Sequence, residues 1–190
     1  GNNLTITSGV ANFASSTDRH VGVGDAIQYD STNDGNIDSI VFIHERASNI
    51  SYTVRNADGS IPTDLVTADQ DWAIFRAYTS ISNSIFQSEN PGISANVRDF
   101  DNSASDKDLV SKGVQLNIAL YADNVHSSEI TITGFTTGPT RELNFFVPYK
   151  TSHVGVRQRH EGKWNDRFFN MNLTSGPSVI NVFNDFTTID

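Results

Sequence analysis

The sequence contains no cysteine, so no disulfide can stabilise the fold. A much smaller secreted protein would normally need such cross-links, but 190 residues are enough to bury a hydrophobic core without them. The absence of cysteine is therefore compatible with a bacterial or archaeal surface protein and equally with a cytosolic one. The length fits one domain of ordinary size, and we expect a single domain over residues 1–190.

Basic residues and long apolar runs are also scarce. The chain carries 13 Lys and Arg against 22 Asp and Glu, and a net charge of −9 would repel a nucleic acid or an anionic membrane. No apolar run approaches the roughly 20 residues that a membrane span requires. The composition favours a β-rich protein instead, because 12 Phe and 5 Tyr supply core material while Ser, Thr, Asn and Gly suit strands and turns.

The familiar catalytic motifs are missing as well. The sequence has no G-x-S-x-G or H-E-x-x-H motif, no P-loop and no dinucleotide-binding fingerprint. Two pairs of neighbours, His44 with Glu45 and Asp99 with Asp101, have the chemistry for acid–base work, but 22 acidic residues produce such pairs by chance. We therefore predict no catalytic residues and no enzymatic activity.

Alternating apolar and polar residues in the first half predict antiparallel strands joined by polar turns. The runs at 25–29 and 39–46 flank an Asp/Asn/Gly loop, which is the pattern of a β-hairpin. Further strands at 4–7, 10–13, 50–54 and 72–78 would complete a β-meander over residues 1–78. The residues that we expect on its buried face are Ile40, Phe42, His44, Tyr52, Trp72 and Ile74.

One short helix is expected near residues 80–88. Ser80 can cap its N-terminus, and Ile81, Ile85 and Phe86 share one helical face. The sequence Asn-Pro-Gly at 90–92 would end it.

The loop at residues 30–38 is rich in oxygen donors around a glycine. Their spacing is typical of a calcium-binding loop, although Thr32 stands at the third position and Val41 where a closing carboxylate is expected. The alternative is an Asx-rich turn whose side chains bond the loop's own backbone. The candidate calcium ligands are Asp30, Asp34, Asn36 and Asp38.

From residue 114 onward, short alternating runs are separated by longer turns. Strands are expected at 114–121, 129–135, 142–147, 168–173 and 179–183. Connections of this length suit successive turns of a parallel β-helix, and an antiparallel sandwich explains the pattern equally well. The fold class is all-β under either alternative. The predicted core residues of this second sub-part, 114–190, are Leu116, Ile118, Leu120, Ile130, Ile132, Phe145 and Val147.

A basic cluster near residues 153–164 and an aromatic stripe are the candidate ligand-binding features. The cluster would grip a carboxylate or an acidic sugar while a tryptophan stacks on the ring; the alternative is a solvated loop whose arginines pair with acidic residues. Trp72, Phe75 and Tyr78 would form a sugar-binding stripe if they are exposed, and part of the core if they are not. The candidate ligand-binding residues of the cluster are Arg157, Arg159, His160 and Trp164.

Three segments of the sequence resemble a region of large secreted bacterial proteins: DQDWAIFRAYTSISN at 69–83, KDLV with QLNIA between 107 and 119, and HVGVRQRHEGKW at 153–164. In those proteins the region leads into a right-handed parallel β-helix of the pectate-lyase-like type. The resemblance spans residues 20–190 and implies that 179–190 forms an early turn of the coil. It carries no activity across, because such enzymes place their carboxylates and basic residues on middle turns of the coil, which this sequence lacks.

These observations predict a non-enzymatic extracellular module, structural or adhesive, with copies of itself as the expected partner. We expect subunits to associate head to tail into a fibre, a mobile N-terminal strand adding to an exposed C-terminal edge. The alternative is a carbohydrate-binding accessory domain, or a fragment of a polysaccharide-degrading β-helix enzyme, with a glycan as partner. The expected assembly residues are Leu4, Ile6, Val10, Phe13, Val179, Val182 and Phe183.

Overall fold

The structure is a computed structural model that describes residues 3–69, 71–101, 104–173, 176 and 178–190. It is all-β, as predicted, with two short α-helices and one 3₁₀ turn among the described residues. Its contacts divide the chain into two compact units. Unit 1 comprises Gly1–Thr79, Glu89–Phe100 and Lys150–Val156, and unit 2 comprises Ser80–Ser88, Asp101–Tyr149 and Arg157–Asp190.

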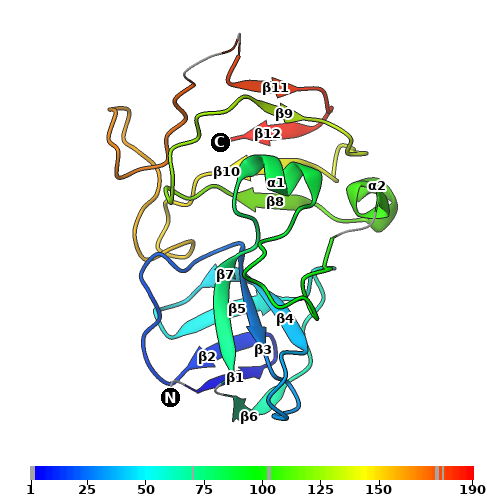
Figure 1. Cartoon of the computed structure of the whole chain (residues 1–190), viewed down its shortest axis with the longest axis vertical. Helices are drawn as coiled ribbons and strands as arrows, with labels where there is room; N and C mark the ends of the chain where they lie inside the picture. Colours follow the sequence, from blue (N-terminus) through cyan, green and yellow to red (C-terminus); the bar gives the residue numbers. More distant parts are fainter. Residues whose placement is uncertain (1–2, 70, 102–103, 174–175, 177) are drawn as a thin grey trace. The chain divides into compact units, whose positions relative to one another are not determined.

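Unit 1 is built on one antiparallel sheet of seven described strands, in the order β6-β1-β2-β5-β4-β3-β7 (Figure 1). The hairpin between the first two strands turns at Ser8 and Gly9, whose φ angles of 51° and 75° suit a tight two-residue turn. The strands are β1 (Leu4–Thr7), β2 (Val10–Phe13), β3 (Asp25–Tyr29), β4 (Ser39–Arg46), β5 (Ser51–Arg55), β6 (Leu65–Asp69) and β7 (Trp72–Arg76).

The predicted hairpin of β3 and β4 and the return through β5 are present, but the residues of β4 that we expected in the core lie on its outer face. Val41 and Ile43 are buried in the core of unit 1, whereas Ile40 and Phe42 are half-buried and His44 is exposed. The predicted register was therefore wrong by one residue. The outer face of β4 is not simply polar, because the Phe42 ring packs edge-on against Phe100 with 4.8 Å between ring centroids. Apolar residues on both faces of a strand remove the alternation that sets the register.

The rest of the unit 1 core agrees with the sequence. Tyr52 is fully buried, and Trp72 and Ile74 pack against the core while remaining half-buried. Arg76 at the end of β7 reaches the buried Asp25 of β3, with its Nη1 atom 2.6 and 2.7 Å from the two carboxylate oxygens. This ion pair fixes the edge strand β7 to its neighbour.

Unit 2 contains parallel strand pairs, which decides between the two arrangements predicted for this region. Strand β10 lies between β8 and β12, and β9 pairs with β11, all in parallel register (Figure 1). The first ladder aligns Ile118, Phe145 and Ile189, and beside them Asn144 donates a 3.0 Å hydrogen bond to Asn117. Stacked turns of this kind are those of a parallel β-helix. The strands are β8 (Leu116–Ala119), β9 (Ile130–Ile132), β10 (Leu143–Phe146), β11 (Ile180–Val182) and β12 (Thr187–Ile189).

The expected helix near 80–88 is α1 (Ile81–Phe86). The Ser80 side chain caps it by accepting a 3.0 Å hydrogen bond from the backbone N–H of Asn83. Ile81 and Ile85 enter the core of unit 2, whereas Phe86, which we expected on the same helical face, is 66% exposed.

The sequence did not predict η1 (Ala104–Lys107) or α2 (Leu109–Lys112). The signals for α2 are an N-cap Asp108 and a left-handed Gly113, which are easily overlooked around a single turn. Residues 168–173, by contrast, were expected to form a strand and make only one isolated bridge, between Met171 and His126.

The core of unit 2 is formed mainly by residues of α1 and of the strands β8, β9 and β10. Of the predicted residues, five are buried and two, Leu116 and Val147, pack against the core while half-buried. The buried five are Ile118, Leu120, Ile130, Ile132 and Phe145. None of the helices in the described part of the chain is long and apolar enough to span a bilayer.

Candidate functional site

The Asp/Asn/Gly loop of residues 30–38 directs its side chains at its own backbone. The Asp30 carboxylate is buried and accepts hydrogen bonds from the backbone N–H groups of Gly35, at 2.6 Å, and Thr32, at 3.0 Å. Asp38 likewise accepts from the Ser31 backbone at 2.8 Å and from the Ser31 hydroxyl at 3.0 Å. Burial raises the pKa of Asp30, but these N–H donors outweigh it and hold the pKa below its ordinary value.

The remaining candidate calcium ligands follow the same pattern. Asp34 accepts a 2.9 Å hydrogen bond from the backbone of Asn36 and a 3.1 Å bond from its side-chain amide. Across the described residues, no group of three or more histidine, aspartate or glutamate side chains is placed to hold a metal ion. The geometry is that of the Asx-rich turn, and calcium binding by this loop stays a prediction.

In the basic cluster of unit 2, both candidate arginines already have acidic partners. Arg157 Nη1 lies 2.7 Å from Glu161 Oε1, and Arg159 pairs with Asp190 and lies over the Tyr149 ring. Each pair is partly exposed to solvent, as expected for side chains that balance local charge. For these two residues the solvated-loop alternative describes the geometry well.

His160 and Trp164 meet in a different setting, a hollow of about 310 Å³ in unit 2. Trp164 is 63% exposed, and its indole N–H donates a 2.8 Å hydrogen bond to Asp166. His160 Nδ1 accepts from the backbone of Gly162 at 3.1 Å, which leaves Nε2 to carry a proton. Lys163 adds a positive charge, and Phe169 and Met171 add apolar surface. The structure therefore brings together two of the four candidate ligand-binding residues.

The aromatic stripe is not an exposed surface. Trp72 packs on Phe13 with 4.6 Å between ring centroids, and Tyr78 packs on Phe100 at 5.9 Å. Phe75 lies against Gly92, where a Cβ atom would come within 3.0 Å of its ring. These rings are half-buried in unit 1, which gives them a structural role.

The candidate assembly residues divide into two groups with opposite surroundings. Leu4 and Ile6 of β1 are fully buried and Phe13 of β2 nearly so, while Val10 is half-buried. Strand β1 has partners on both sides, β2 and β6, so it is not the mobile segment that we expected. The expectation failed because an uncharged apolar strand near a terminus is equally suited to the interior of a sheet.

The C-terminal group is exposed, as expected. Phe183 is 74% exposed, Val182 45% and Val179 37%, and Phe186 and Ile189 of the same turn are nearly half exposed. Strand β12 pairs with β10 on one side, and no described strand pairs with its other side. The backbone N–H of Asp190 donates to the carbonyl of Phe145, and its carbonyl accepts from the N–H of Val147. Because the N–H groups of successive residues in a strand point to opposite sides, those of Thr187 and Ile189 point away from β10.

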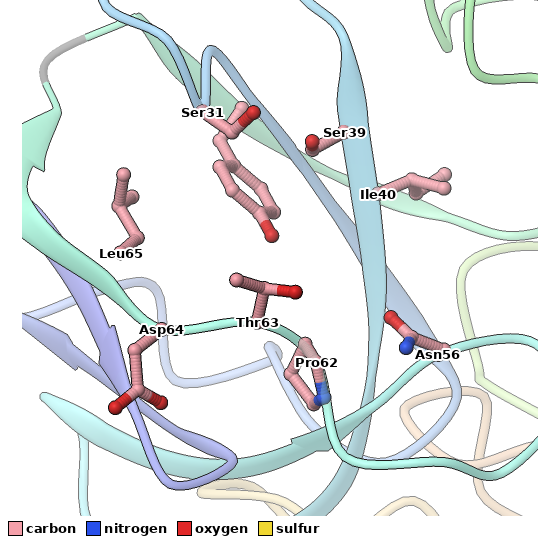
Figure 2. A pocket seen from close by; sticks show the side chains of 9 residues that line it. Ser31, Ser39, Ile40, Asn56, Pro62, Thr63, Asp64 and Leu65 are labelled. Carbon is pink, nitrogen blue, oxygen red and sulfur yellow. The ribbon is translucent and has the colours of Figure 1, made fainter.

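A second hollow, of about 350 Å³, lies in unit 1 where several strands end (Figure 2). It is lined from the end of β3, the start of β4, the residue after β5 and the segment that leads into β6. The sequence analysis missed it, because its residues are separated along the chain and share no motif. They are Tyr29, Ser31, Ser39, Ile40, Asn56, Pro62, Thr63, Asp64 and Leu65.

The two pairs considered for acid–base work, His44 with Glu45 and Asp99 with Asp101, lie in different settings. His44 and Glu45 are both exposed on β4. Burial raises the pKa of Asp101 to about 6, against the opposing charges of Lys107 and Lys112, and its Oδ1 atom has no hydrogen-bond partner among the described residues. Comparisons of this chain with protein-family models, curated proteins and solved structures find no match.

Proposed function

We propose that this chain is a non-enzymatic structural or adhesive module of an extracellular assembly. Copies associate through the exposed segment of residues 179–190, which is called here the last turn of unit 2. The observation that carries the proposal is the difference in side-chain exposure along the ladder of strands β8, β10 and β12. Ile118 in β8 is 8% exposed and Phe145 in β10 is 2% exposed, whereas Ile189 in β12 is 46% exposed.

In stacked turns, each turn buries the apolar face of its neighbour. The first turn is covered, since α1 packs against β9 and places Ile81 and Ile85 in the core. The last turn instead presents Val182, Phe183 and Phe186 to solvent. An apolar sheet edge with unpaired N–H groups is a surface that pairs with another chain.

The contact differs from the head-to-tail exchange expected at first. Strand β1 would have to leave its own sheet to supply the missing strand, because it is paired on both sides. Contact between the last turns of two copies needs no unfolding and uses the same surface twice, so it closes at a dimer.

Sedimentation velocity over a range of protein concentrations tests this proposal. The wild-type chain should shift from monomer to dimer as concentration rises, and Phe183→Lys should remain monomeric. Phe86→Lys is the matched control, since Phe86 is a similarly exposed phenylalanine of unit 2 outside the last turn. A wild-type chain that stays monomeric, or equal effects of the two substitutions, contradicts the proposal.

A second candidate function, binding of an acidic glycan, is supported by the hollow at Trp164. An exposed indole beside Lys163 offers a stacking platform and a positive charge, and His160 adds a ring N–H donor. Oligogalacturonate should quench the exposed Trp164 and leave the half-buried Trp72 largely unaffected, and Lys163→Gln should weaken the quenching. Unchanged fluorescence at saturating oligosaccharide would eliminate this candidate.

A further inference from the structure

The unit 1 hollow has an apolar floor and a polar rim. Tyr29, Pro62 and Leu65 are buried beneath it, while Ser31 and Thr63 are exposed at its mouth. Its volume of about 350 Å³ lies at the lower end of the range for small-molecule sites. The hollow therefore suits a small ligand with one apolar face and one polar edge.

The polar groups around the hollow are mainly hydrogen-bond acceptors. The Ser31 hydroxyl donates to Asp38 at 3.0 Å and the Asn56 amide nitrogen donates to Ser60 at 2.9 Å. With the Ser31 proton and one amide proton of Asn56 directed elsewhere, the Ser31 oxygen and Asn56 Oδ1 can accept from a ligand, and the second amide proton of Asn56 can donate to it. Figure 2 shows Ser39, Thr63 and Asn56 around the hollow, with the Asp64 carboxylate turned outward. A ligand that carries several O–H donors matches this set.

The charge around the hollow selects against anions. Among its described lining residues there is no lysine, arginine or histidine, and Asp64 stands at the rim with Asp38 close behind Ser31. A carboxylate or phosphate on a ligand would be repelled there. Both aspartates already accept backbone N–H groups, Asp64 from Ser8 at 2.6 Å and Asp38 from Ser31 at 2.8 Å, so part of their charge is compensated. A neutral ligand is favoured over a cation for that reason.

We propose that this hollow binds a neutral sugar, with the C–H face of the ring over Pro62 and Leu65 and its hydroxyls at the rim of Ser39, Asn56 and Thr63. The site is distinct from the hollow at Trp164, which offers positive charge and an exposed ring. It is also independent of association through the last turn of unit 2, so either proposal can fail without the other.

The test is a titration followed by ¹H–¹⁵N NMR with glucose, galactose, mannose, fucose and N-acetylglucosamine, and with glucuronate, glucosamine and calcium chloride as comparisons. At least one neutral sugar should cause saturable shifts of the amides of Ser39, Asn56 and Thr63. Thr63→Val keeps the shape of the side chain and removes one hydroxyl, and it should weaken that binding about three- to tenfold. Thr151→Val is the matched control, because Thr151 is an exposed threonine of unit 1 at the opposite end of β4, beside Arg46.

The control should bind as tightly as the wild-type chain, and both variants should keep the wild-type dispersion of amide resonances. The proposal is overturned if none of the neutral sugars gives saturable shifts at these amides. It is also overturned if glucuronate, glucosamine or calcium binds there more tightly than every neutral sugar, or if Thr63→Val and Thr151→Val bind alike.

Discussion

Two short apolar strands, β1 in unit 1 and β12 in unit 2, look alike in the sequence and have opposite surroundings. Ile6 of β1 is fully buried between two partner strands, whereas Ile189 of β12 is 46% exposed on a strand paired on one side only. The apolar character of a strand therefore does not show whether its edge is free. The deciding factor is whether the sheet supplies a second neighbouring strand.

Removal of the first strands should have the largest effect. Deletion of residues 1–13 takes β1 and β2 out of the sheet, which leaves β6 without a partner and removes Leu4, Ile6 and Phe13 from the core. We expect unit 1 not to fold, which loss of dispersed methyl and amide NMR resonances would report. A deleted chain that keeps a native spectrum would show instead that these strands are a dispensable arm.

The ion pairs that hold two edge strands should differ strongly. Arg76→Met leaves the buried Asp25 carboxylate without its partner and should lower the free energy of unfolding by about 3–5 kcal/mol. Arg159→Met removes the partly exposed partner of Asp190, next to β12, and should cost about 1 kcal/mol or less. Urea unfolding measures both, and equal losses would mean that the two edges are equally well secured.

Alanine substitutions of one isoleucine in each strand compare β1 and β12 directly. Ile6→Ala should destabilise by about 2–5 kcal/mol, because it empties a fully buried site. Ile189→Ala should cost about 1 kcal/mol or less in a dilute sample, since much of the side chain already faces water. A large loss for Ile189→Ala at low concentration would place that side chain in a covered core.

The smallest effect concerns pH and the buried Asp101 of unit 2. Its folded pKa of about 6 exceeds the value of about 3.9 in an unfolded chain, so its favourable contribution is complete below about pH 4 and lost as pH rises through 6. Asp101→Asn should therefore be more stable than the wild-type chain at pH 7, by about 1–2 kcal/mol after allowance for partial exposure. The two proteins should have equal stability near pH 4, and a constant difference at all pH values would argue against the burial of this carboxylate.

The sequence predicted the positions of the strands better than it predicted which strands pair with each other. Period-two alternation located six of the seven described strands of unit 1 and most of those in unit 2, and Ser80 marked the start of α1, but β6 lies in a segment that we expected to be a loop. The alternation failed at β4, because Phe42 covers the outer face against Phe100 and makes both faces of the strand apolar. Pairing partners depend on contacts far apart in the chain, so the alternation could not show that β6 flanks β1.

The candidate sites illustrate the same limit. The oxygen donors of the loop at 30–38 were correctly noted, but only the structure shows that Asp30 and Asp38 accept from the loop itself. The hollow at Ser39, Asn56 and Thr63 has no signature along the chain, since three segments bring those residues together. The resemblance to secreted β-helix proteins stays a prediction, while the parallel pairing that it implied is present.

Residue-resolved hydrogen exchange at low and high protein concentration tests most directly whether the outer edge of β12 is an association surface. The amides of Thr187 and Ile189 face away from β10 and should exchange rapidly in the dilute chain. They should become protected at high concentration, while amides of β1 and β10 are protected in both samples. Rapid exchange at Thr187 and Ile189 at every concentration, or protection already in the dilute monomer, would contradict the account.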